Sequence, residues 1–368
     1  MNKLISALLL LFYSCSGSTE RNEPTPTSME VPSFMDGADL SYVNEMEDCG
    51  AIYRNLQNIE QDPFQIFKDA GAEIVRVRLW NGPDWTDYST LRDVKKTIRR
   101  AKALNLKVLL DFHYSDTWAD PKKQIIPRDW LGSIGNRVQL GDLLYDYTQA
   151  VLRDLIQENL TPDIVQVGNE INIMILQEED HHSEQIDWER NAYLINRGIS
   201  AIRDLNREIE VMLHIAQPEN ALWWFSEASE NGIIDYDWIG LSYYPKWSTY
   251  TLENIDRPLK FLIETSQKKL MVVETAYPYV LENIDEANNI LDESSLIEGY
   301  PASIQGQYDY LIRLKSKIIA GGGSGLIYWE PAWVSTPCNT LWGTGSHWEN
   351  ATLFDFNNQA IKGIEFME

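Results

Sequence analysis

The sequence predicts a single (β/α)8 TIM barrel, a fold of the α/β class, on three observations. After residue 33 the chain alternates strand-like and helix-like segments eight times. Several strand-like segments are apolar almost throughout, as expected when helices cover one face of a strand and a barrel interior covers the other. With 368 residues, 44% of them hydrophobic, the chain can bury one core of that size. An open, doubly wound sheet is the alternative that these patterns leave open.

The expected strands are short apolar runs, and the expected helices show apolar residues at a spacing of about 3.6. No linker interrupts the alternation, so one domain is expected over residues 33–368. The strands are expected at 34–42, 73–80, 107–114, 163–171, 210–217, 238–245, 270–277 and 325–333. The clearest helices are expected at 91–104, 143–156, 193–205 and 308–319.

The start of the chain is typical of an export signal. Lys3 precedes an apolar stretch at 4–12 that is too short to span a bilayer, and small residues follow at 14–17. We therefore expect a signal peptide over 1–15 and a flexible Ser/Thr/Pro-rich tether over 16–32. Cys15 at the junction resembles the lipidated cysteine of a bacterial outer-membrane lipoprotein. Plain secretion, with Cys15 lost along with the signal, is the alternative.

Charge narrows the range of partners. The chain has 55 acidic and 31 basic residues, a formal net charge of −24. Such a surface repels nucleic acid, anionic lipid and acidic polymers, so a neutral or cationic partner is favoured and nucleic acid is excluded. A lipid anchor would be the only membrane contact, and a monomer is expected.

Two cysteines remain past the signal. Cys49 and Cys338 fall in the loops after the first and last expected strands, which become neighbours when a barrel closes. A disulfide is geometrically possible there, and two buried free thiols are equally compatible with the sequence.

Polar side chains recur where the expected strands end. Barrel enzymes place their chemistry at the C-terminal ends of the strands, and structural need alone would not place polar residues there so regularly. These residues are Arg76, Arg78, Asp111, His113, Asp116, Asn169, Glu170, Tyr243, Tyr244, Glu274, Trp329, Glu330 and Trp333.

Glu170 and Glu274 are the most informative of these residues. Strands four and seven are three apart in a ring of eight, so the two carboxylates face each other across the barrel mouth. Opposed carboxylates at about 5–5.5 Å can flank a glycosidic bond and cleave it with retention. Arg76 would lower the pKa of Glu274, as a nucleophile requires, whereas partial burial and the charge of Glu274 would raise that of Glu170, as an acid requires. The alternative for each glutamate is a structural ion pair at a strand end.

Asn169 and the tryptophans fit a carbohydrate site. Asn169 could donate to a sugar 2-hydroxyl, a contact that strengthens as positive charge develops on the ring. Flat apolar rings offer contact area to the C–H faces of sugars, although core packing is the alternative for any single tryptophan. Of 13 tryptophans, those expected in or beside mouth loops are Trp80, Trp85, Trp118, Trp247, Trp329, Trp333 and Trp342.

Several segments resemble one enzyme family. Gly168-Asn169-Glu170 and Val273-Glu274-Thr275 are similar to the acid/base and nucleophile motifs of the retaining clan A of barrel glycosidases. Residues 76–80 (RVRLW), 111–121 (DFHYSDTWADP), 240–245 (GLSYYP) and 274–278 (ETAYP) together resemble the arabinogalactan endo-β-1,4-galactanases of glycoside hydrolase family 53. The similarity runs from about Gly37 to Phe356.

The resemblance implies endo-hydrolysis of β-1,4-galactosidic linkages in galactan or type I arabinogalactan by a retaining double displacement, with no cofactor for the chemistry. It implies Glu170 as acid/base and Glu274 as nucleophile. Arg76 and Arg78 lie on one face of a strand, so one of them is expected to form an ion pair inside the barrel. The residues expected to bind substrate are Asp39, Arg76, His113, Asp116, Trp118, Asn169, Tyr243, Trp329 and Trp333.

Two segments depart from the family pattern. Residues 172–182 are polar and acidic where relatives carry a Gly-x-Leu-Trp-Pro-like loop, so the resemblance does not give the product length. Residues 283–289 lie where bacterial relatives bind structural calcium, and Asp285 and Asn288, with Asn289, offer oxygens. Calcium needs six to eight oxygens in a recognised loop, so a solvated turn is favoured and no calcium is predicted. His181 and His182 are interpreted as a surface pair rather than as metal ligands.

Two other functions remain open. One is another glycosidase of the same clan, acting on mannan, xylan or glucan. The second is a non-catalytic glycan-binding lipoprotein, against which the opposed pair of glutamates argues.

Overall fold

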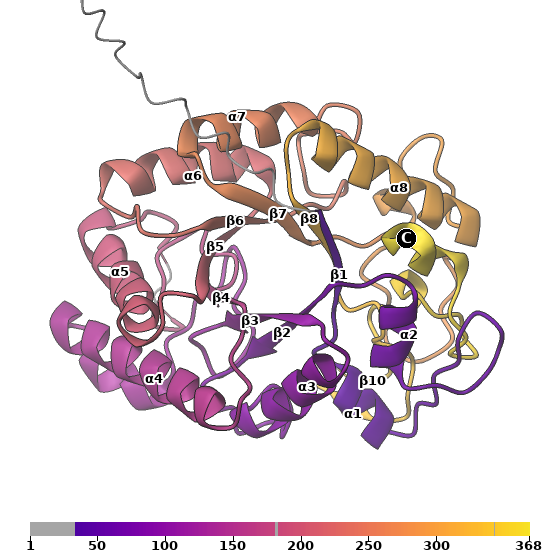
Figure 1. The fold of residues 1–368 in the computed structure, drawn as a ribbon, viewed down its shortest axis with the longest axis horizontal. Helices are drawn as coiled ribbons and strands as arrows, with labels where there is room; N and C mark the ends of the chain where they lie inside the picture. The colour runs from indigo at the N-terminus through magenta and orange to yellow at the C-terminus, as the bar shows by residue number, and fades with distance from the viewer. Residues whose placement is uncertain (1–33, 181–182, 342) are drawn as a thin grey trace, which may run out of the picture. The chain divides into compact units, whose positions relative to one another are not determined.

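A computed structural model describes residues 34–180, 183–341 and 343–368. Eight parallel strands form a closed barrel in sequence order, and the last strand pairs with the first at Met35↔Gly325. Figure 1 shows the strands at the centre and helices around them. The predicted TIM barrel is therefore confirmed, and the open sheet is excluded because an open sheet leaves its edge strands unpaired. The expected signal peptide and the whole of the expected tether, together with His181, His182 and Trp342, lie outside the described residues.

The eight observed strands fall almost wholly within the expected ranges but end earlier. The chain leaves the sheet at residues with positive φ, such as Tyr114 (48°), Glu170 (44°) and Glu330 (48°), which a regular strand does not allow. The strands are β1 (Met35–Asp39), β2 (Ile74–Leu79), β3 (Lys107–Phe112), β4 (Ile164–Val167), β5 (Glu210–Ala216), β6 (Trp238–Ser242), β7 (Lys269–Glu274) and β8 (Gly325–Tyr328).

The four helices expected from apolar spacing are present, and three of them begin earlier than expected. Their first turns carry few apolar residues, but Asn136, Asp187 and Ser303 accept backbone N–H groups and cap α4, α5 and α8. The helices are α1 (Val43–Asp48), α2 (Pro63–Asp69), α3 (Leu91–Ala103), α4 (Arg137–Gln157), α5 (Trp188–Leu205), α6 (Pro218–Glu230), α7 (Asp256–Ser266) and α8 (Ile304–Ala320).

Short elements complete the described chain. They are the 3-10 helices η1 (Arg128–Ser133), η2 (Glu293–Ser295), η3 (Glu349–Ala351) and η4 (Lys362–Met367), and the hairpin strands β9 (Asn339–Thr340) and β10 (Gly343–Thr344). No helix of the described residues is long and apolar enough to cross a membrane.

The barrel interior changes from apolar to polar along the strands. An apolar layer fills its lower part with Met35, Ile74, Leu109, Ile164, Met212, Trp238, Met271, Val273 and Ile327. Because side chains on one face of a strand recur every second residue, the next interior positions of β2 to β5 are Arg76, Asp111, Gln166 and His214. The apolar layer therefore supports a polar layer directly above it.

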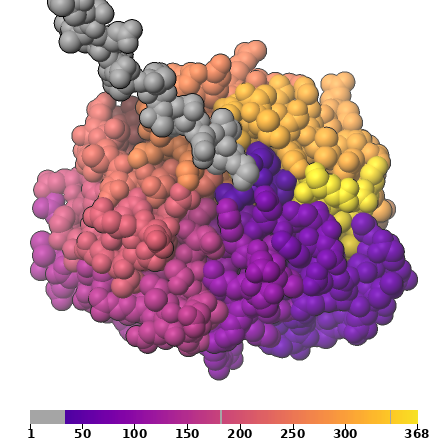
Figure 2. Space-filling view, viewed as in Figure 1, coloured from indigo at the N-terminus to yellow at the C-terminus, as the bar shows by residue number. Residues whose placement is uncertain are grey.

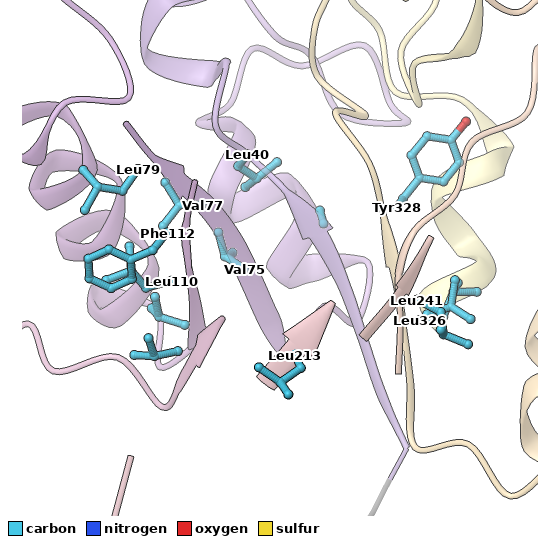
Figure 3. Packing of buried hydrophobic residues seen from close by; sticks show 14 of the residues in the cluster. Leu40, Val75, Val77, Leu79, Leu110, Phe112, Leu213, Leu241, Leu326 and Tyr328 are labelled. Carbon is cyan, nitrogen blue, oxygen red and sulfur yellow. The ribbon is translucent and has the colours of Figure 1, made fainter. Parts of the chain in front are cut away.

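A second core lies between the strands and the helices. Strand residues such as Val75, Leu110, Phe112 and Leu241 point outward and are fully buried against the helix layer (Figure 3). Burial of this kind stabilises the fold by about 25 cal/mol for each Å² of apolar surface. The interior is thus free to hold polar residues, because the outer layer carries most of the apolar packing.

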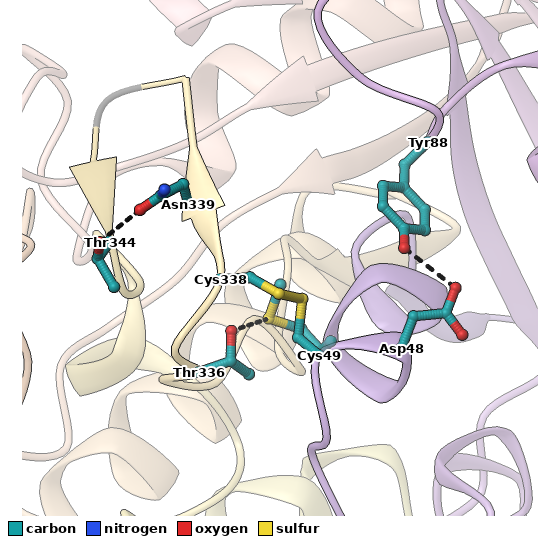
Figure 4. Close-up of a disulfide and its surroundings, with 8 residues drawn as sticks. Asp48, Cys49, Tyr88, Thr336, Cys338, Asn339 and Thr344 are labelled. Atoms are coloured by element: carbon teal, nitrogen blue, oxygen red, sulfur yellow. Dashed lines mark hydrogen bonds between the residues drawn. A yellow bond between two sulfur atoms is a disulfide. The ribbon is translucent and has the colours of Figure 1, made fainter.

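Cys49 and Cys338 form a disulfide, with Cα atoms 5.8 Å apart (Figure 4). The sequence left a disulfide and two buried free thiols as alternatives, and the structure contains the disulfide. It joins the residue that follows α1 to the long segment after β8, across 289 residues of sequence. The bridge holds that segment against the start of the barrel, and the same segment supplies Trp333 and Trp348 to the barrel mouth.

The disulfide predicts a thiol count. In a chain that begins at Ser33, unfolded without reductant, neither Cys49 nor Cys338 should react with a thiol reagent, and both should react after reduction. Reduction should also lower the free energy of unfolding by about 2–4 kcal/mol, because a long loop in the unfolded chain is released. The Cys49→Ser/Cys338→Ser double variant is the control, since reductant should not change its stability. Two reactive thiols before reduction would show that the bridge does not form.

Candidate active site

A cavity of about 910 Å³ opens at the C-terminal ends of the barrel strands. Its size suits several sugar units, since small-molecule sites are typically about 300–1,000 Å³. Of the site residues expected from the sequence, those that line it are Asp39, Arg76, His113, Trp118, Asn169, Glu170, Glu274, Trp329 and Trp333. The fold therefore brings the expected catalytic and substrate-binding residues together in one cavity, except Tyr243 and Asp116.

Arg76 on β2 is the centre of the buried polar layer. One terminal nitrogen, Nη1, lies 2.8 Å from both Asp39 Oδ2 and Glu274 Oε1. The other, Nη2, lies 2.8 Å from Asp111 Oδ2 and from Asn169 Oδ1. The guanidinium is 1% exposed, so its charge requires these partners, because an unpaired buried ion is strongly destabilising.

The two expected arginines have different partners. Arg78 forms an ion pair with Glu330 and lies over the rings of Tyr42 and Trp118, at 4.4 and 4.3 Å from their centroids. It lines the cavity, but it does not contact the two glutamates of interest. Arg76 is therefore the residue joined to Glu274, and Arg78 forms the ion pair inside the barrel that was expected of one of them.

The electrostatics separate Glu170 from Glu274. Burial raises the pKa of Glu274 to about 7, although Arg76 opposes this rise. Burial and the charge of Glu274 raise the pKa of Glu170 well above its usual range, against a hydrogen bond from Ser242. Arg76 thus acts on Glu274 in the expected direction, but burial outweighs it. The ion pair with Arg76 favours the ionised form of Glu274, and the negative charge of Glu274 favours the protonated form of Glu170.

The turn after β4 places Glu170 and Asn169. Gly168 and Glu170 both have positive φ, 85° and 44°, and a Cβ on Gly168 would lie 2.5 Å from Ile171 Cγ2. Gln124 fixes the turn by donating to the carbonyl oxygens of Asn169 (2.8 Å) and Glu170 (3.2 Å). A non-glycine residue at positive φ is strained, so surrounding contacts must hold Glu170 in place. The turn ends the strand and directs the side chains of Asn169 and Glu170 into the barrel mouth.

A register irregularity places Glu274. Leu241 of β6 pairs with Val272 of β7, but the next residue, Ser242, pairs with Glu274 rather than Val273. Irregularities of this kind re-aim side chains next to active sites. Both Val273 and Glu274 can therefore reach the interior, Val273 in the apolar layer and Glu274 in the polar one.

His113 and Asn169 hold fixed orientations. Nδ1 of His113 accepts from Trp80 Nε1 (3.3 Å) and from the N–H of Ala119 (3.2 Å), so its proton lies on Nε2, 3.2 Å from Asp111 Oδ2. Asn169 donates one N–H to Ala119 O (2.9 Å), which leaves its second N–H for another partner.

Tyr243 and Asp116 are corrections to the expected site. Side chains alternate past the end of β6, so Tyr243 points outward and donates to Tyr250 O (3.1 Å), while Tyr244 lines the cavity. Asp116 accepts the backbone N–H groups of Gly82 (2.9 Å) and Arg128 (2.8 Å), and it does not line the cavity. It ties the loops after β2 and β3 together rather than facing the cavity.

Aromatic rings line much of the mouth. Trp329 and Trp348 meet edge to face at 4.7 Å, and Trp348 Nε1 donates to Trp329 O (3.2 Å). Trp247 also lines the cavity and is 47% exposed, whereas Trp80 is buried and packs against Trp118. Trp348 was not expected at the site, because it lies far along the segment after β8. Tyr244 was expected at the end of its strand but not among the substrate-binding residues, because the family motif contains two adjacent tyrosines.

Three polar residues behind the lining were also missed as site residues. They are Gln166, His214 and Ser242, all fully buried. Gln166 donates to Asp111 Oδ1 (2.6 Å), and His214 and Ser242 lie next to Glu170. Period-two alternation from the apolar layer would have indicated Gln166 and His214, since each lies two residues after an inward apolar residue.

The loop considered for calcium is held by backbone contacts. Asp285 accepts from the N–H groups of Ala287 (2.8 Å) and Ser346 (2.7 Å), and the carbonyl oxygen of Asn288 lies 2.7 Å from His347 Nδ1. Within residues 34–180, 183–341 and 343–368, no group of three His, Cys, Asp or Glu residues is arranged to hold a metal ion.

A closed (β/α)8 barrel with two interacting glutamates at its mouth, Glu274 buried and Glu170 partly buried, defines a glycoside hydrolase of the barrel type. The chain belongs to glycosyl hydrolase family 53, whose family model matches residues 35–367. It is a glycoside hydrolase, and the chemistry of this family needs no cofactor.

Named relatives and a solved structure agree with this family. The chain is 53% identical to an arabinogalactan endo-beta-1,4-galactanase of Cellvibrio japonicus, over 100% of this chain and 97% of the relative. It is 34% identical to an endo-beta-1,4-galactanase of Bacillus subtilis, over 91% of this chain and 85% of the relative. The catalytic domain from Ignisphaera aggregans superposes with a TM-score of 0.85 at 30% identity, covering 93% of this chain and 97% of that structure.

The Arg76 contacts predict a titration result. Arg76→Gln should raise the pKa of Glu274 above about 7, because the neighbouring positive charge is lost. It should also destabilise the fold by about 3–5 kcal/mol, since Asp39 and Asp111 stay buried without their partner. Carboxylate infrared difference spectra against pH, with Glu274→Gln as the assignment standard, measure the shift.

Arg78→Gln is the matched control for that experiment. It removes an equally buried arginine whose partner is Glu330, so it should destabilise the fold while leaving the pKa of Glu274 almost unchanged. Equal pKa shifts in the two variants would contradict the assignment of Arg76 to Glu274.

Proposed function

We propose that the protein hydrolyses β-1,4-galactosidic linkages within galactan and type I arabinogalactan, with retention of configuration. The observation that carries the proposal is the pair of glutamates in one cavity, of which Glu274 contacts Arg76 at 2.8 Å and Glu170 has a pKa raised by burial and by the charge of Glu274. The full-length similarity to arabinogalactan endo-beta-1,4-galactanases supports the choice of substrate.

The mechanism has two displacements. In the first, Glu274 attacks the anomeric carbon and forms a glycosyl ester, while Glu170 passes its proton to the departing glycosidic oxygen. In the second, Glu170 takes a proton from water, the water oxygen attacks the anomeric carbon, and the ester bond to Glu274 breaks. Two inversions at one carbon give net retention. The raised pKa of Glu170 fits the group that must be protonated first.

Neighbouring groups would bind the reacting sugar. The second N–H of Asn169 is available for a 2-hydroxyl, and the contact would strengthen as positive charge develops on the ring. Arg76 holds Glu274 and Asn169 in one arrangement. Trp329, Trp333 and Trp348 offer apolar faces to sugar rings. A neutral polymer is not repelled by the net charge of −24.

Two rival functions are less well supported. A pure glycan-binding protein gains nothing from burying two carboxylates next to each other, because their repulsion is unfavourable unless it serves catalysis. A glycosidase of the same clan that acts on mannan, xylan or glucan would use the same pair of glutamates. Activity on purified polysaccharides separates these possibilities.

Substrate cleavage tests the main proposal. The wild type should release reducing ends from linear β-1,4-galactan, and mixed short oligosaccharides should appear early because internal bonds are cut. Glu274→Ala should lower the rate by roughly 10³–10⁴-fold, since the attacking group is lost. Glu282→Ala removes an exposed glutamate after β7 and is the control, with an activity close to wild type. Wild-type protein that binds the polymer without cutting it would support the binding function instead.

We infer that the protein is exported through residues 1–15 and that a lipid on Cys15 anchors the catalytic domain (33–368) to an outer membrane through the tether (16–32). The positive start, the short apolar stretch and the cysteine at the small-residue junction support this inference. The mass of the mature N-terminus in a bacterial host should show Cys15 with attached acyl chains. An unmodified N-terminus past Cys15 would indicate plain secretion.

A further inference from the structure

Two buried residues behind the cavity connect to Glu170 through one of its carboxylate oxygens. The Ser242 hydroxyl donates to Glu170 Oε1 at 2.6 Å. Ser242 Oγ also lies 2.9 Å from His214 Nε2. His214 on β5 and Ser242 on β6 are fully buried, so solvent does not compete for these contacts.

The surroundings of His214 fix the position of its ring proton. The backbone N–H of Glu170 lies 3.3 Å from His214 Nδ1, and it can donate only to an unprotonated nitrogen. Gln166 Nε2, a donor, also lies 3.1 Å from Nδ1. Asn169 Oδ1 is 2.9 Å away, but its two lone pairs already have donors in Arg76 Nη2 (2.8 Å) and Gln166 Nε2 (3.2 Å). Nδ1 is therefore an acceptor, and a neutral ring carries its proton on Nε2.

The ring is held neutral. Burial and the positive charge of Arg76 lower the pKa of His214 well below its usual value, and His113 acts in the same direction, while Asp111 opposes them. A neutral ring with its proton on Nε2 donates to Ser242 Oγ. The hydroxyl hydrogen of Ser242 cannot point to Nε2, which carries the ring proton and cannot accept, so it points to Oε1 of Glu170.

We propose that His214 and Ser242 are positioning residues that form a hydrogen-bond chain with a fixed direction. Nε2–H of His214 donates to Oγ of Ser242, and Oγ–H of Ser242 donates to Oε1 of Glu170. Oε1 is thereby kept as a hydrogen-bond acceptor. The inference rests on the proposed role of Glu170 as acid/base. The other oxygen, Oε2, then carries the proton in both displacements: it passes the proton to the glycosidic oxygen in the first and recovers one from water in the second. The chain itself loses and gains no proton.

The charges around Glu170 explain why such a chain is useful. Glu274 on β7 and Asp120 after β3 raise the pKa of Glu170, Arg76 on β2 lowers it, and Tyr244 after β6 lies near both glutamates. Both negative groups disfavour the ionised form of Glu170, which arises when Glu170 gives up its proton. A buried donor at Oε1 stabilises that carboxylate without using the oxygen that faces the reaction.

The test uses three variants and the pH dependence of kcat/KM on galactan. Ser242→Ala removes the donor to Oε1 of Glu170, and His214→Leu removes the N–H that directs the Ser242 hydroxyl toward it, so each variant should raise the pKa of Glu170 further. Activity falls at high pH when Glu170 loses its proton, so a higher pKa moves the alkaline limb to higher pH, by about one unit for the loss of one hydrogen bond to a charged group. In His214→Gln the amide N–H lies near the former Nε2, and it should move the limb back toward the wild-type position.

A second substrate separates positioning from general damage. An aryl β-1,4-galactobioside with a good leaving group does not need proton donation in the first displacement. Its glycosylation rate in single-turnover experiments should fall much less than cleavage of galactan in Ser242→Ala. Ser324→Ala, a buried serine before β8 at the opposite end of the barrel, is the control and should keep both the rate and the pH profile.

Clear results would overturn the inference. If the alkaline limb stays in place in Ser242→Ala while both substrates slow equally, Ser242 serves packing alone. If ¹⁵N NMR of the ring shows the His214 proton on Nδ1, the chain runs the other way. If the wild type does not cut galactan at all, the proposed function fails, and the NMR measurement still decides the direction of the chain.

Discussion

The buried guanidinium of Arg76 is the interaction on which the rest of the site depends. It contacts side chains from β1, β3, β7 and the turn after β4, so four parts of the barrel end are joined through one residue. Three of its partners are carboxylates that would repel one another without it. Burial would raise the pKa of Asp111, but Arg76 and His113 outweigh it and hold that pKa below its usual value. Glu274 shares the same cation and keeps a higher pKa, close to neutrality.

The barrel makes this arrangement possible by separating two kinds of packing. Helices and the outward faces of the strands provide most of the apolar core, and one apolar layer closes the lower interior. Polar residues can then occupy the next interior level, where each finds a partner. The residues of this level are almost fully buried, and electrostatic interactions are stronger in such surroundings than in water.

Different backbone geometry and different contacts hold Glu170 and Glu274 in place. Glu274 reaches the interior through the register irregularity between β6 and β7, and Arg76 fixes its carboxylate. Glu170 sits at a strained turn, and Gln124, His214 and Ser242 contact its backbone or side chain. A cation therefore faces one carboxylate and a neutral donor faces the other. This difference in surroundings gives two identical side chains different proton affinities.

The sequence by itself determined the fold class, the strand and helix order, and most of the cavity lining, because alternation and apolar spacing are local patterns and strand ends in a barrel must converge. It also pointed to Glu170 and Glu274, since polar residues at strand ends interrupt otherwise apolar runs. Only the tertiary structure decided the Cys49–Cys338 bridge, Tyr244 in place of Tyr243, and the places of His214 and Ser242 behind Glu170. These depend on strand register, on where each strand stops, and on distances between residues far apart in the chain, none of which a local pattern encodes.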